Sequence, residues 1–92
     1  SAQVGKWDWD LVTNNLTLNK TWYTKLGYEY NELPQSMETF EGRLHPDDKP
    51  RVFHELERHM KGETLFYECR YRMLSKTGEV QWCFDRGCII YR

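Results

Sequence analysis

The stretch RLHPDDKPRVFHELERHM, residues 43–60, holds side chains that could do chemistry. Two adjacent aspartates, Asp47 and Asp48, have the residue type that acid/base catalysis uses. The same carboxylates suit the first turn of a helix, because they complement the positive end of the helix dipole. Pro46 fits the first helical position, where no N–H donor is needed. We therefore predict a capped amphipathic helix here and no acid/base pair.

The histidines of this stretch raise the alternative of a metal site. At about 100° per residue, His54 lies nearly opposite the apolar arc of the predicted helix, and His59 lies at the edge of that arc. Helical zinc motifs place two histidines at positions i and i+4, on one face. These two histidines do not share a face, so their spacing predicts no metal site. The apolar arc itself consists of Val52, Phe53, Leu56 and Met60.

Length and composition exclude several classes of protein. The 92 residues are 39% hydrophobic and 15% aromatic, which is enough for one core. A chain this short buries only roughly 60–65% of its unfolded surface, so a large separate active-site cleft is not expected. The net charge of −1, without a basic run, argues against nucleic-acid binding. No apolar stretch approaches the roughly 20 residues of a membrane span, and no phosphate loop or nucleophile elbow occurs. We expect neither catalytic residues nor direct membrane contact.

The three cysteines, Cys69, Cys83 and Cys88, are odd in number and form no C-x-x-C pair. This pattern favours free thiols in a reducing compartment and gives no zinc site. The alternation around them predicts that Cys69 lies on the apolar face of a sheet and Cys83 on the opposite face.

Hydrophobic periodicity predicts two hairpins around a helical middle. Asn19 is placed to cap the first helix, and Gly27 to end it. The order of elements is β-β-α-α-α-β-β, which is an α+β pattern. The predicted elements are strands over 5–11 and 16–18, helical segments over 20–26 and 37–44, a helix from Pro46 to Gly62, and strands over 65–74 and 79–92.

The register of the second hairpin follows from parity. A loop with an even number of residues places Met73 opposite Trp82. It also places Tyr71 opposite Phe84, so that one face is continuously apolar. A loop with an odd number of residues mixes the faces, so we predict the even loop.

The other face of that hairpin then sets Arg70 opposite Asp85, which is a favourable cross-strand ion pair. Gly87 is a candidate bulge that changes the facing of the residues after it.

Four segments, taken together in this order, resemble a PAS domain of the subgroup common in bacterial sensor proteins, the sensory box. No segment is specific alone, but their order and spacing are, and they cover nearly all of residues 4–92. The segments are GKWDWDLVT, WYTKLGYEYNELP, LHPDDKPRV and YECRYRMLSKTGEVQWCFDRGCIIYR.

The resemblance implies a five-stranded antiparallel sheet with short helices on one face and a ligand or cofactor cleft between them. It implies one sensory domain over residues 1–92, taken from a larger cytoplasmic or membrane-anchored signalling protein. Typical effectors in such proteins are histidine kinases, diguanylate cyclases and phosphodiesterases. We expect an effector on the C-terminal side and a homodimer.

The end of the chain departs from the family pattern. Relatives continue into a last strand that lies in the middle of the sheet, whereas this sequence stops at Arg92. Without that strand, unpaired edges are expected next to Trp7 and Ile89, and such edges recruit other chains. We expect the strand to be absent, or its place to be taken by a partner chain or a shifted strand. Direct pairing of the two hairpins within one chain would contradict this.

The aromatic side chains are the residues of this sequence best suited to binding a ligand. Ordinary core packing is one interpretation. The other is a small pocket for an aromatic or heterocyclic ligand, with tyrosine hydroxyls as polar groups. The candidate residues are Tyr67, Tyr71, Trp82 and Phe84 on the sheet, with Tyr23 and Phe40 on the helices.

Two cofactors known in PAS relatives do not fit the sequence. Flavin-thiol photochemistry needs a cysteine in the segment equivalent to residues 36–45, and none is there. Haem in some relatives uses a histidine on the long helix, but His54 points away from the core and His59 is marginal. The cofactor is left open.

The sequence as a whole predicts a regulatory module and no enzyme. A small ligand or a partner chain would shift the packing between sheet and helices, and the shift would pass to the effector. The alternative is a ligand-free dimerisation module. A small stand-alone enzyme is the third possibility.

Overall fold

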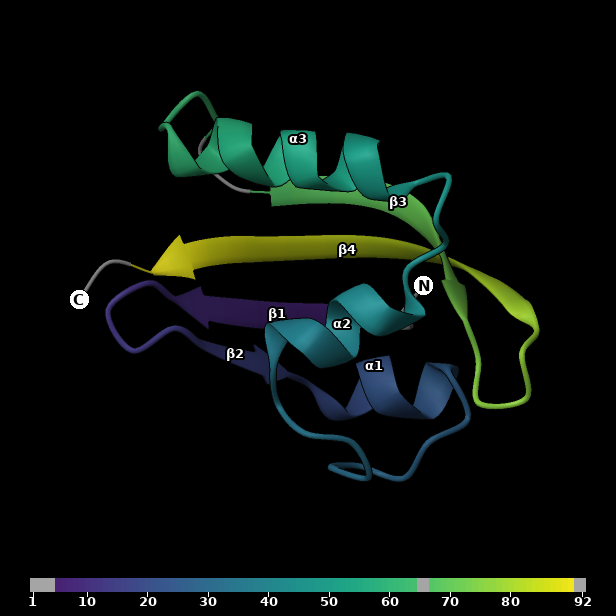
Figure 1. Ribbon diagram of the computed structural model, residues 1–92. Coiled ribbons are helices and arrows are strands. Elements are labelled where there is room, and N and C mark those ends of the chain that lie inside the picture. Colours follow the sequence, from purple (N-terminus) through teal and green to yellow (C-terminus); the bar gives the residue numbers. More distant parts are fainter. Residues whose placement is uncertain (1–4, 65–66, 91–92) are drawn as a thin grey trace.

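The computed structural model describes residues 5–64 and 67–90 as four strands and three helices (Figure 1). The predicted α+β order is confirmed. The elements are β1 (Gly5–Asp10), β2 (Asn15–Leu18), α1 (Lys20–Lys25), α2 (Met37–Arg43), α3 (Lys49–Met60), β3 (Tyr67–Leu74) and β4 (Val80–Ile90).

The strands form one sheet in the order β2-β1-β4-β3. The two hairpins are antiparallel. The helices gather on one face, with α1 and α2 beside the first hairpin and α3 beside β3 (Figure 1). Alternate strand residues meet these helices and form the core. The buried apolar residues on the strands are Trp7, Leu16, Leu18, Cys69, Tyr71, Met73 and Cys83, and those on the helices are Trp22, Tyr23, Phe40, Val52 and Leu56.

The expected gap in the middle of the sheet is closed. β1 pairs directly with β4, in parallel, with Trp7 opposite Gly87 and Trp9 opposite Ile89. Removing an antiparallel strand from between two strands leaves its neighbours parallel, so direct pairing satisfies their backbone groups without reversing either strand. A parallel pair needs a long crossover, which the segment holding the three helices supplies. The expectation of unpaired edges, filled by a partner chain or a shifted strand, is therefore wrong for this structure.

The predicted register of the second hairpin is also wrong. Tyr71 lies opposite Cys83, and Arg72 opposite Trp82. The loop 75–79 has an odd number of residues, since Leu74 pairs with Val80. Within it, Gly78 adopts a positive φ of 87°, and its N–H donates to Ser75 O at 2.9 Å. This shift by one residue reverses the faces of β4.

The reversal moves three predicted positions. Trp82 and Phe84 lie on the outer face, where 58% and 38% of their surface is exposed. Cys83, predicted to face outward, is buried instead. Arg70 lies opposite Phe84 and not Asp85, and the register continues through Gly87 without a bulge.

The first two helices begin at polar caps. Asn19 Oδ1 accepts a hydrogen bond from Trp22 N at 2.9 Å, and Gly27 follows the helix with a φ of 85°, as predicted. Ser36 caps α2 by accepting from Thr39 N at 3.2 Å. These caps satisfy N–H groups that have no partner inside the helix.

Helix α3 differs from its prediction in two ways. It begins at Lys49, after a turn in which Asp48 N donates to His45 O at 2.9 Å. Its buried face holds His59, while Met60 is 41% exposed, so the apolar arc is rotated from the predicted one. His59 is accommodated because its Nδ1 lies 3.1 Å from both oxygens of Thr64. No described helix is long and apolar enough to cross a membrane.

Both outer edges of the sheet are partly covered. At β2, the side-chain amide of Gln35 bonds to both backbone groups of Leu18: Nε2 donates to Leu18 O at 2.9 Å, and Oε1 accepts from Leu18 N. At β3, His45 N donates to Arg72 O at 3.0 Å, and Leu44 forms a bridge with Met73.

Candidate functional site

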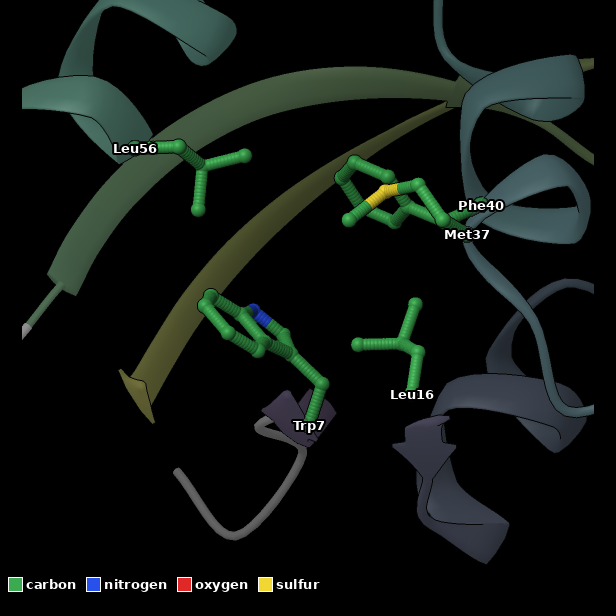
Figure 2. Close-up of a pocket in the computed structure, with 5 residues that line it drawn as sticks. All are labelled: Trp7, Leu16, Met37, Phe40 and Leu56. Carbon is green, nitrogen blue, oxygen red and sulfur yellow. The ribbon is translucent and has the colours of Figure 1, made fainter. Parts of the chain in front are cut away.

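An apolar pocket lies where the first hairpin meets α2 and α3. Figure 2 shows the five side chains around one common space. The free space within it is about 10 Å³, which is roughly what one water molecule requires. The lining residues are Trp7 from β1, Leu16 from β2, Met37 and Phe40 from α2, and Leu56 from α3.

Burial distinguishes the walls of this pocket from its rim. Trp7, Leu16, Phe40 and Leu56 are each at most 5% exposed, whereas Met37 is half-buried. Because methionine is unbranched and flexible, Met37 is the lining side chain best able to make room. None of the five described side chains that line the pocket is charged.

Of the predicted binding residues whose side chains the structure describes, only Phe40 lines this pocket. Tyr71 is fully buried, with its ring 5.6 Å from that of Phe40 in an edge-to-face contact. Trp82 and Phe84 point away on the outer face. The side chain of Tyr67 lies outside the described residues.

Tyr23 is buried in the core between α1 and the loop that follows it. Its hydroxyl donates to Leu33 O at 2.8 Å, and its ring makes an edge contact with Trp22 at 5.1 Å. Burial, with a smaller contribution from Tyr30, raises the pKa of Tyr23 above its usual value of 10.0. Its polar group is therefore used internally, by the backbone, and not by the pocket.

Replacing Tyr23 by phenylalanine is expected to lower the free energy of unfolding by about 1 kcal/mol, because Leu33 O loses its donor. The raised pKa means that the contribution of the neutral phenol is complete below pH 10 and is lost as the pH rises through the folded-state value. Chemical denaturation at pH 7 measures the first effect. Ultraviolet titration of wild type and variant measures the second, and an ordinary tyrosine titration in both proteins would contradict it.

The sequence missed Trp7, Leu16, Met37 and Leu56 as pocket residues. Their signals were present, since Trp7 belongs to the first alternating strand and Leu56 to the apolar arc of the long helix. The prediction placed the pocket at the second hairpin because that hairpin is rich in aromatic residues, and it therefore omitted the first hairpin.

Asp48 does not cap α3 with its side chain. Its carboxylate instead accepts from Arg72 N and Arg72 Nη2, both at 2.7 Å, and from Arg72 Nε at 3.1 Å. The side-chain bonds to Arg72 are the main reason that the pKa of Asp48 falls from 3.8 to about 2. Helix-cap chemistry was therefore the wrong explanation for Asp48, which joins the start of α3 to β3.

The thiols and histidines form no reactive cluster in the described part of the chain. Cys69 and Cys83 are buried thiols, and Arg51 Nη1 lies 3.2 Å from Cys69 Sγ. His54 is exposed, as predicted, and His59 faces Thr64. Among the described residues no three His, Cys, Asp or Glu side chains could together hold a metal ion. The side chain of Cys88 lies outside them.

A sheet with short helices on one face, and a small pocket between the two layers, defines a two-layer α+β domain. A family model described as PAS fold matches residues 15–92. The chain belongs to this family and is a PAS sensory domain, as its resemblance predicted.

One solved structure extends the comparison. The crystal structure of a sensory box histidine kinase/response regulator from Burkholderia thailandensis E264 is 32% identical, with a TM-score of 0.69. The match covers 88% of this chain and 59% of that chain. No curated protein sequence gave a significant match.

Proposed function

We propose that this domain is the sensory module of a bacterial signal-transduction protein, and that it binds a small apolar ligand in the pocket between the first hairpin, α2 and α3. The apolar lining of that pocket carries the proposal. The parent protein is a histidine kinase, as the similar solved structure is described, or a diguanylate cyclase or phosphodiesterase. The effector follows on the C-terminal side, in the cytoplasm, and the domain itself does not catalyse a reaction.

The lining determines the class of ligand. A charged group would lose its hydration there without gaining a partner, since the lining side chains of Trp7, Leu16, Met37, Phe40 and Leu56 carry no charge. The ligand is therefore uncharged and mainly apolar. Neither haem nor a flavin-thiol adduct is part of the proposal.

Because the pocket is small, a ligand can bind only if side chains or helices around the pocket move. Free space of about 10 Å³ does not hold a molecule larger than roughly one water. A ligand must displace Met37 or move α2 or α3 from the sheet. Such a ligand shifts the equilibrium between closed and open packing by its difference in affinity for the two, and only a few kcal/mol are needed for a signal.

Binding of small apolar molecules tests this function. Native mass spectrometry of the purified chain would detect a co-purified ligand, and thermal unfolding with benzene, toluene or indole would detect added ones. A ligand at about 100 times its Kd adds about 2.7 kcal/mol to the free energy of unfolding. We expect a raised midpoint with at least one of these molecules.

Replacing Met37 by alanine is expected to strengthen that binding, because it enlarges an apolar cavity that can stay dry. Met60→Ala is the matched control, since Met60 lies exposed on α3, outside the pocket. Calorimetric titration with benzene compares the two variants. Equal affinities in both, or no binding in either, would contradict the pocket proposal.

A ligand-free dimerisation module remains the second candidate, because Trp82 and Phe84 expose large apolar surface on the outer face. Analytical ultracentrifugation of the chain tests it. A concentration-dependent dimer, together with no binding of the apolar probes, would favour this candidate.

A further inference from the structure

A second hollow lies at the rim of the sheet, away from the apolar pocket. β1 pairs with β4 only from Asp85 onward, so the range 80–84 has no described strand on that side. The hollow there measures about 380 Å³, within the range of roughly 300–1,000 Å³ typical of small-molecule sites. Its lining residues are Lys25 from α1, Arg70 from β3, and Trp82, Cys83 and Phe84 from β4.

The aromatic members of this rim hollow have accessible rings. Trp82 is 58% exposed and Phe84 38%. Guanidinium groups already lie over both: Arg70 is 5.9 Å from the centroid of Phe84, and Arg72 is 5.5 Å from that of Trp82. Cationic planes and aromatic faces of this kind are the surfaces on which planar rings stack.

The cations of the rim hollow differ in their partners. Arg72 is held by Asp48 at 2.7 Å, so it positions the Trp82 ring and is not available to a ligand. Lys25 and Arg70 form no ion pair with any acidic side chain that the structure describes. Within the described part of the chain, two positive charges from different elements therefore line one hollow without an ion-pair partner.

We propose that the rim hollow binds an anion that carries a planar ring, which is the chemistry of a nucleoside phosphate or an aromatic carboxylate. The ring stacks on the exposed faces of Trp82 and Phe84, and the anionic group binds Lys25 and Arg70. The apolar pocket excludes such a ligand because it offers no cation. The two sites are therefore separate, and the rim site does not depend on the function proposed above.

Titration of the complete chain with adenosine monophosphate (AMP) tests the proposal, with adenosine, inorganic phosphate and indole-3-acetate as comparison ligands. We expect saturable binding of AMP or indole-3-acetate with a Kd of about 1 mM or tighter, and much weaker binding of adenosine and phosphate. Whichever of AMP and indole-3-acetate binds more tightly identifies the ligand class as a nucleoside phosphate or an aromatic carboxylate. The indole N–H signal of Trp82, assigned by its loss in Trp82→Phe, should shift during the titration.

Variants locate the site. Trp82→Ala and Lys25→Gln are each expected to weaken binding about tenfold, as loss of a stacking ring or of an ion contact does. Lys20→Gln, an exposed charge at the other end of α1, is the matched control and should bind as wild type does. Far-ultraviolet circular dichroism checks that each variant is folded.

Several results would overturn the proposal. They are no binding of either aromatic anion, phosphate binding as tightly as AMP, and equal affinity in Trp82→Ala and wild type. A dimer that Trp82→Ala abolishes, in a protein that binds no aromatic anion, would assign the rim to a protein interface instead.

Discussion

Replacing Tyr71 by alanine is expected to lower the free energy of unfolding by about 4 kcal/mol. Tyr71 is 0% exposed, and its ring packs edge-to-face on Phe40 at 5.6 Å. Removing a buried aromatic ring lowers the free energy of unfolding by about 3–5 kcal/mol, because the transfer free energy of the ring is lost and a cavity remains. The total free energy of unfolding of a small domain is only about 5–15 kcal/mol. The midpoint of thermal unfolding should fall by roughly 20 °C.

Trp82→Ala is the matched control for this experiment, because it removes a larger ring from the outer face of the neighbouring strand. It should cost about 1 kcal/mol or less, mainly through the lost contact with Arg72. Urea unfolding of both variants compares them, with Tyr71→Phe as a milder third variant. If Trp82→Ala proves more destabilising than Tyr71→Ala, the strand register described here is wrong.

Replacing Asp48 by asparagine is expected to cost about 2–3 kcal/mol at pH 7. The carboxylate, 8% exposed, accepts three hydrogen bonds from Arg72, and the variant leaves part of that donor set without a partner. The same hydrogen bonds lower the pKa of Asp48 from 3.8 to about 2, which corresponds to about 2 kcal/mol.

The lowered pKa of Asp48 also predicts how the effect of Asp48→Asn on stability depends on pH. A lowered folded-state pKa stabilises the protein above the unfolded value of 3.8, and that contribution is lost as the pH falls through about 2. The difference between wild type and Asp48→Asn should therefore shrink between pH 4 and pH 2. Urea unfolding across this range measures it. Asp47→Asn is the control, because Asp47 is exposed, and it should stay within about 0.5 kcal/mol of wild type. A difference that is constant with pH would exclude the ionised carboxylate as its source.

Local signals in the sequence were sufficient for the elements. Asn19 and Gly27 bounded α1 correctly because capping depends on backbone groups within one turn. The alternation around Trp7 predicted β1, and the order of four motifs identified the family. These features depend on neighbours in the chain, so one sequence holds the information for them.

Long-range features were not predictable in the same way. The faces of β4 depended on whether the loop 75–79 had an odd or even number of residues, and the alternation of side chains did not predict this correctly. The contact between Asp48 and Arg72 joins two elements whose relative placement no periodicity shows. Prediction of the pocket needed the same long-range information, and for that reason Phe40 alone, among the described side chains of the predicted set, lines it.

The covering of the two sheet edges has a consequence for behaviour in concentrated solution. A bare edge offers alternating N–H and C=O groups to any passing chain, the first step of fibril growth. At Leu18 the Gln35 amide occupies both groups, and at Arg72 the Asp48 carboxylate takes the N–H while His45 holds the carbonyl. Two polar side chains and the backbone amide of His45 thus occupy edge groups with which another chain could otherwise pair, without adding a strand.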